Sequence, residues 1–200
     1  MIDHIPDVKQ NMASHNNIES NFYIFIFLSV TSLFAVCSSS PTLTTDRSSI
    51  FKYELDRIPQ DQTKIYFDIK SGKEAYISLS NQKYSLDDMY VVVIGDRRGR
   101  QASIRKCLQC ANVASKLLSQ TEFLSDEEFR SFWVSWEDGV IAVGRGDEAA
   151  AFMEWREEEQ EEALVVNYVG VATGSDDGVG EFRFCDIGMF FQLWLPIFFF

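Results

Sequence analysis

Histidine is nearly absent from this 200-residue sequence, and both copies, His4 and His15, precede the first apolar run. The part of the chain that can fold therefore has no imidazole. This absence excludes histidine-based catalytic triads, histidine-ligated metals and imidazole acid–base catalysis from that part. We expect no catalytic residue and no metal ligand set.

Positive charge is scarce as well. The chain has 18 Lys and Arg against 30 Asp and Glu, which gives a formal net charge of -12 at pH 7. A field of this sign repels polyanions, because electrostatic steering of nucleic acid depends on a positive surface. The sequence therefore predicts no nucleic-acid partner.

Helix patterns are the third feature that is nearly missing. The best candidate is a single turn at residues 125–129, where Ser125 can cap and Glu128 stands at the capping-box position. No strand–helix alternation accompanies it. This argues against a doubly wound α/β fold, in which helices alternate with strands.

Short strands dominate what is present. Ile65, Phe67 and Ile69 alternate with polar residues, which is typical of a strand with one buried face. Residues 89–95 are a continuous, mostly β-branched run, as expected for a strand buried on both faces. An Asp-Gly pair at 138–139 separates two alternating runs and predicts a hairpin.

About eight or nine such strands follow one another, separated by Gly-rich or charged turns. We predict an all-β fold, an antiparallel β-sandwich of jelly-roll-like type with very little helix. The expected organisation is a leader at 1–38, a linker at 39–62, the sandwich at 63–186 and an apolar tail at 187–200.

The leader contains an apolar, uncharged stretch at residues 21–36, followed by Cys37 and three serines, as in a signal peptide. It is shorter than the about 20 apolar residues of a transmembrane helix. We therefore expect a secreted, extracellular protein. The residues before the stretch are more acidic than is usual for a signal peptide, so the alternative is a protein anchored in the membrane by this segment.

The tail at 187–200 is apolar and uncharged, but it is too short to span a bilayer and contains Pro196. It resembles either a lipid-anchor signal or a segment foreign to the domain, and we favour the second. A membrane partner is expected only if the leader or the tail is retained.

Four groups of residues, in this order, resemble the farnesoic acid O-methyltransferase domain family of invertebrate proteins. The resemblance covers about residues 65–185. The matching residues are Ile94-Gly95 with Ser103-Ile104-Arg105, Phe132-Trp133 with Trp136, Gly139 with Val143-Gly144, and Gly170-Val171 with Thr173-Gly174. The chain departs from the family pattern at residues 96–100, after Gly174 and in the acidic run that begins near Glu154.

The family name implies methyl transfer from S-adenosylmethionine to farnesoic acid, in the formation of methyl farnesoate and juvenile hormone. Such cofactors usually lie at a Gly-rich turn between a parallel strand and a helix. The G-x-G at Gly144 and Gly146 follows a hairpin strand with no helix pattern after it, which indicates a turn. We therefore favour a non-catalytic extracellular binding module without a cofactor, and the methyltransferase is the alternative.

A module of this kind would bind a carbohydrate, a surface protein or a small apolar ligand through the loops of a rigid sandwich. Aromatic rings and charged side chains would form the site. The candidates are Trp133, Trp136, Trp155, Arg105, Arg130 and Asp138. Core packing is the alternative for the tryptophans, which alternate with apolar positions, and a structural ion pair is the alternative for Arg105.

The cysteines Cys107 and Cys110 form a C-x-x-C motif. In a secreted chain this motif favours a disulfide over a zinc or redox site. We expect Cys185 to pair with one of them, or two bridges to form if Cys37 is retained. The tripeptide at 145–147, Arg-Gly-Asp, is known as an integrin ligand, but its position at a glycine turn indicates a chance match.

Overall fold

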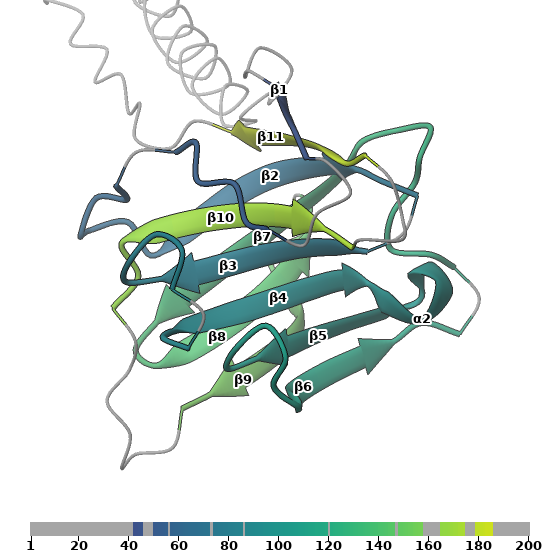
Figure 1. Ribbon diagram of the computed structural model, residues 1–200. Helices are drawn as coiled ribbons and strands as arrows, with labels where there is room; N and C mark the ends of the chain where they lie inside the picture. Colours follow the sequence, from purple (N-terminus) through teal and green to yellow (C-terminus); the bar gives the residue numbers. More distant parts are fainter. Residues whose placement is uncertain are drawn as a thin grey trace, which may run out of the picture. The chain divides into compact units, whose positions relative to one another are not determined.

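The computed structural model describes residues 42–45, 50–55, 57–72, 74–85, 87–119, 121–146, 148–157, 165–174 and 179–185. These residues form two antiparallel sheets that pack face to face (Figure 1). The leader, Cys37, the apolar tail and most of the acidic run lie outside the described residues. No helix in the described ranges is long and apolar enough to cross a membrane.

One sheet has six strands in the order β1-β11-β2-β7-β8-β9, and the other has five in the order β10-β3-β4-β5-β6. The bounds of the strands are β1 Thr42–Thr44, β2 Lys64–Lys70, β3 Ala75–Ser80, β4 Met89–Gly95, β5 Gln101–Arg105, β6 Asn112–Leu117, β7 Arg130–Glu137, β8 Val140–Arg145, β9 Ala151–Arg156, β10 Tyr168–Thr173 and β11 Glu181–Cys185.

The predicted all-β sandwich with very little helix is confirmed. The described residues hold eleven strands, more than the eight or nine expected. Strands β1 and β6 add to the count, and β6 shows no alternation because it is exposed along nearly its whole length. The only helix in this part of the chain is α2 (Asp96–Gly99), a four-residue turn.

Residues 125–129, where a single helical turn was predicted, contain a bend and no helix. The capping contact is nevertheless present, because the Ser125 hydroxyl accepts hydrogen bonds from the backbone N–H groups of Glu127 and Glu128 at 3.1 and 3.2 Å. Ser125 therefore stabilises a loop that passes over the end of the six-stranded sheet.

Strand β4 is buried along its entire length, as its unbroken apolar sequence predicts. One face, with Val92 and Ile94, contributes to the core between the sheets. The other face, with Val91 and Val93, packs under Phe51 in a second apolar cluster. The segment at residues 50–55 thus covers the outer face of the five-stranded sheet.

Strands β7 and β8 form the predicted hairpin, with the turn at Asp138 and Gly139. Both residues have positive φ, 50° and 70°, which is the backbone geometry of the tight hairpin turns that match strand twist. The register of this hairpin places Trp133 opposite Gly144. A Cβ atom on Gly144 would lie 2.1 Å from Cε2 of Trp133, so the indole ring occupies the space that a side chain would need.

We expect Gly144→Ala to lower the free energy of unfolding by about 1–3 kcal/mol, because the added methyl group overpacks against Trp133. Urea denaturation would measure the change. Gly72→Ala is the matched control, since its Cβ would lie at an ordinary 3.5 Å from Cβ of Asp126. Equal effects of the two changes, or the same loss from Gly144→Ala in a Trp133→Leu background, would contradict this account.

Candidate functional site

Two neighbouring strands of the six-stranded sheet place arginine where their buried faces end. On β7, Val134 and Phe132 are buried, and Arg130 is the next residue on the same face. On β8, Val143 is buried and Arg145 follows on the same face. Both arginines therefore lie on the inner face of the six-stranded sheet. Each stands at the end of its strand, next to the last buried apolar residue on that face.

Pairing between the strands holds these side chains together. Arg145 lies directly opposite Phe132, and Arg130 lies opposite Ile69 of β2, which is fully buried. Residues that are opposite each other in an antiparallel pair share a face of the sheet. The ladder of β2, β7 and β8 thus brings two guanidinium groups to one open end of the core.

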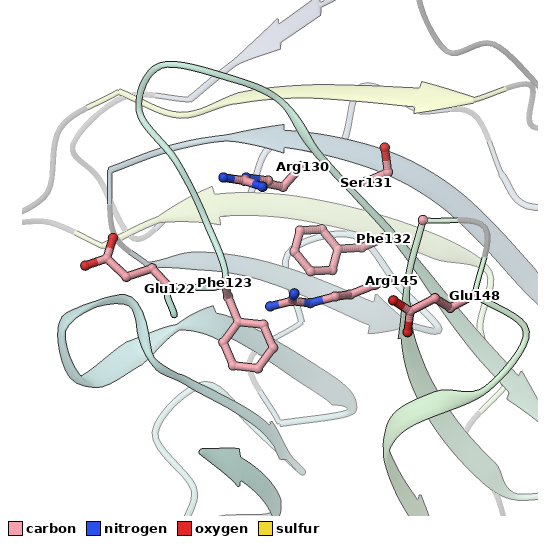
Figure 2. A pocket seen from close by; sticks show the side chains of 8 residues that line it. Glu122, Phe123, Arg130, Ser131, Phe132, Arg145 and Glu148 are labelled. Atoms are coloured by element: carbon pink, nitrogen blue, oxygen red, sulfur yellow. The ribbon is translucent and has the colours of Figure 1, made fainter. Parts of the chain in front are cut away.

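A pocket of about 190 Å³ lies at this end (Figure 2). Strand ends and the loop before β7 supply its walls. Its lining residues are Glu122, Phe123, Arg130, Ser131, Phe132, Arg145, Gly146 and Glu148.

Phe123 closes the pocket from the side of the five-stranded sheet. Its backbone N–H donates a 2.7 Å hydrogen bond to the carbonyl of Gly99, and its side chain is only 1% exposed. The ring packs 5.1 Å from the ring of Phe152, centroid to centroid. On the pocket side, the guanidinium carbon of Arg145 lies 5.0 Å from the centroid of Phe123.

Arg145 retains an unused donor. Its Nη2 atom is buried and has no hydrogen-bond partner. Glu122 and Glu148 line the same pocket, but the structure records no ion pair between either carboxylate and Arg145. Leaving such a group unsatisfied costs about 1–3 kcal/mol, so a folded protein rarely keeps one without a partner from outside.

Arg130 differs from Arg145 in its surroundings. Its side chain is 51% exposed and forms a 2.6 Å ion pair with Glu128, which is 64% exposed. Exposed ion pairs contribute little free energy, because water screens them. Arg130 can therefore leave Glu128 for a ligand at small cost, whereas Arg145 is already fixed.

The three tryptophans predicted as binding residues occupy packed positions. Trp133 is 4% exposed, its indole N–H donates to the carbonyl of Glu148 at 2.8 Å, and the Lys64 ammonium covers its ring at 3.7 Å. Trp136 and Trp155 pack against the main core. Trp136 and Trp155 remain partly exposed, and the contacts of all three rings agree with the core-packing alternative.

Arg105 stabilises the turn that follows β5. It donates to Oδ1 of Asn112 at 2.8 Å and to the carbonyl of Leu108 at 3.3 Å, and it lies 3.6 Å from the carboxylate of Asp96. Asp138 lies in the β7–β8 turn, at the opposite end of these strands from the pocket. Of the six predicted binding residues, the pocket lining includes Arg130 alone.

Tyr76 of β3 faces the same side of the molecule as Arg105 and donates its hydroxyl hydrogen to Glu74. Burial raises the pKa of Tyr76 well above its ordinary range, and the hydrogen bond to Glu74 raises it further. Tyr76 therefore stays protonated at physiological pH and cannot act as a general base there.

Arg145 was not among the residues predicted from the sequence, although the period-two pattern contained the signal for it. Arg145 falls two residues after Val143, on the buried face of its strand. Its place in the tripeptide at 145–147 drew attention to the turn instead, and Asp147 lies outside the described residues. Glu122, Phe123 and Glu148 belong to loops, where no periodicity marks them.

Cys107 and Cys110 are joined to each other, with a Cα–Cα distance of 5.0 Å, which is ordinary for a disulfide. The predicted pairing of Cys185 with one of them is therefore wrong. The reason is topological: Cys185 ends β11 in the six-stranded sheet, whereas Cys107 and Cys110 follow β5 in the other sheet. Cys185 is also disulfide-bonded.

Fold and site together define a β-sandwich module with a small charged pocket at one open end. Residues 48–186 match the family described as "Farnesoic acid 0-methyl transferase", and the chain belongs to this family. The resemblance noted in the sequence is thereby confirmed. No curated protein matches the chain.

Several solved structures are similar in fold, at low sequence identity. A Bacillus subtilis protein of unknown function with a galectin-like fold is 9% identical with a TM-score of 0.45, and the match covers 72% of this chain and 86% of that one. A homodimeric agglutinin from chicken liver is 15% identical with a TM-score of 0.40, over 72% of this chain and 99% of the agglutinin.

We expect Arg105→Ala to lower the free energy of unfolding by about 1–2 kcal/mol, because it removes the contacts to Asn112, Leu108 and Asp96. Urea denaturation of the disulfide-bonded protein would measure this. The control is Arg156→Ala, which loses one exposed hydrogen bond to the carbonyl of Asp138. If the two variants are equally stable, Arg105 is not a structural residue.

Proposed function

We propose that this chain is a non-catalytic recognition module that acts outside the cell and binds a carbohydrate in the pocket at the ends of β7 and β8. The observation that carries the proposal is the buried Nη2 donor of Arg145, which has no hydrogen-bond partner among the residues that the structure describes and belongs to a side chain that lines an open pocket. A ligand with oxygen acceptors would satisfy this donor.

The chemistry of the pocket suits a polyhydroxylated ligand. Sugar hydroxyls both donate and accept hydrogen bonds, and this lining offers guanidinium donors from Arg130 and Arg145 together with carboxylate acceptors from Glu122 and Glu148. These groups come from two strand ends and two loops, the usual arrangement of a binding site on a rigid scaffold.

The size of the pocket supports a small ligand group. Its volume of about 190 Å³ is below the range of about 300–1,000 Å³ in which drug-sized ligands bind. One sugar unit at the end of a chain is of suitable size. S-adenosylmethionine and farnesoic acid together would need far more space than this pocket has.

The family description is what favours the alternative, an S-adenosylmethionine-dependent methyltransferase acting on farnesoic acid. A carboxylate is already ionised at neutral pH, so its methylation needs no general base. The two functions therefore differ in ligand size more than in catalytic residues. Binding measurements separate them directly.

The disulfides support an extracellular site of action. Cys107 and Cys110 are bonded to each other, and Cys185 is bonded as well. Such bonds persist in oxidising compartments and are rare in the cytosol. A carbohydrate or a protein at a cell surface would be available to the module there.

To test the proposal, we would titrate the purified, disulfide-bonded chain with a panel of soluble glycans by calorimetry. We expect at least one glycan to bind saturably, and Arg145→Met to weaken that binding by at least about tenfold, since charge-assisted hydrogen bonds are the strong ones. Arg156→Met is the control: Arg156 ends β9, opposite Val140 at the end of β8 that is far from the pocket, and the variant should bind as the wild type does.

Parallel titrations with S-adenosylmethionine and with farnesoic acid test the alternative. Saturable micromolar binding of S-adenosylmethionine, together with no response to any glycan, would overturn the proposal in favour of the enzyme. Binding of farnesoic acid alone would point to a carrier of a small apolar ligand and would also contradict it.

A further inference from the structure

We infer that the group bound by Arg145 is a carboxylate, so that the module recognises an acidic sugar such as a uronic or sialic acid. This inference rests on the proposed function for the sugar part of the ligand. The carboxylate part rests on the surroundings of Arg145 and stands independently of the sugar.

The positive charge and the unpartnered donor of Arg145 favour a carboxylate as the bound group. A guanidinium stays protonated at any physiological pH, so its charge persists inside the pocket. The Nη2 atom is buried without a hydrogen-bond partner, and no ion pair to Arg145 is recorded among the described residues. A neutral hydroxyl can accept a hydrogen bond from this donor, but a carboxylate accepts a charge-assisted hydrogen bond, which is about twice as strong.

The direction of the Arg145 side chain also favours binding of a ligand group in the pocket. Figure 2 shows the guanidinium of Arg145 extending away from the carboxylate of Glu148 and toward Phe123. The Phe123 ring holds it there, with the guanidinium carbon 5.0 Å from the ring centroid. An arginine fixed in this way loses little side-chain freedom on binding, which favours affinity.

Arg130 supplies a second cation on the same inner face of the sheet. Its present partner is Glu128, and both side chains are more than half exposed, at 51% and 64%. Exchanging this ion pair for a carboxylate in the pocket costs little, because exposed pairs contribute little free energy. Both arginines line the pocket, so both are available to a carboxylate bound there.

The negative charges of the chain limit the kinds of anion that can bind in the pocket. The chain carries a net charge of -12, and Glu122 and Glu148 stand in the pocket lining. Their field repels nucleic acids and heavily sulfated polymers, for which long-range attraction supplies most of the binding. A single carboxylate within a largely neutral sugar escapes most of this repulsion and still reaches the guanidinium groups.

The test compares probes that differ in one functional group. We would titrate the purified, disulfide-bonded chain with methyl β-D-glucuronide, its methyl ester and methyl β-D-glucoside, and likewise with the methyl α-glycoside of N-acetylneuraminic acid and its methyl ester. We expect at least one acid to bind about tenfold or more tightly than its own ester.

Arg145→Met should remove the preference for acid over ester, and Arg145→Lys should keep part of it, because the charge remains without the planar fork. Arg156→Met is again the control. We expect the melting temperature of Arg145→Met to equal or exceed that of the wild type, because the change removes a buried guanidinium nitrogen that has no hydrogen-bond partner among the described residues. A large fall in melting temperature together with lost binding would mean that Arg145 is structural, and would overturn the inference.

The other outcomes separate this inference from the proposed function. If esters and glucoside bind as tightly as the acids, the carboxylate inference is wrong while carbohydrate recognition stands. Sodium farnesoate serves as a carboxylate without a sugar. If it binds in an Arg145-dependent manner and no sugar does, Arg145 is a carboxylate site but the carbohydrate proposal fails. If neither the acids nor farnesoate binds, the inference is overturned.

Discussion

The burial of the inner faces of the two sheets is the constraint on which the rest of the structure depends. Packed sheets lie about 10 Å apart, and side chains at every second position must fill the space between them. In the six-stranded sheet Phe67 and Phe132 do so, with ring centroids 6.3 Å apart. The pocket arises where this filling stops, because the next inward positions hold Arg130 and Arg145 and only Phe123 closes the gap.

The two outer faces of the sandwich differ from the open end of the core, where we propose that a ligand binds. Phe51 and Tyr53 cover the outer face of the five-stranded sheet in a buried apolar cluster. On the outer face of the other sheet, Ser131 donates a 2.7 Å hydrogen bond to Asp68. In contrast, the open end of the core contains both the pocket and the Nη2 donor of Arg145, which has no hydrogen-bond partner among the described residues.

Alternation of apolar residues was sufficient to predict the sandwich, the β7–β8 hairpin and the doubly buried β4, because burial of a face imposes a period of two. Strand β6 could not be predicted in this way, since an exposed edge strand has no buried face. Among the site residues, Arg145 follows the buried period and was open to prediction. Phe123 was not, because its position depends on a loop whose conformation is set by tertiary contacts.

The hydrogen bond from Phe123 to the carbonyl of Gly99 connects the wall of the pocket to the short turn α2. Gly99 has a φ of 81°, and the side chain of Glu122 packs against it. This turn lies within residues 96–100, where we expect the chain to differ from the family pattern. Replacing this turn with that of another family member would therefore change the shape of the pocket wall. The strands that carry Arg130 and Arg145 would keep their register. Changes in the proposed ligand preference can thus be separated from changes in folding.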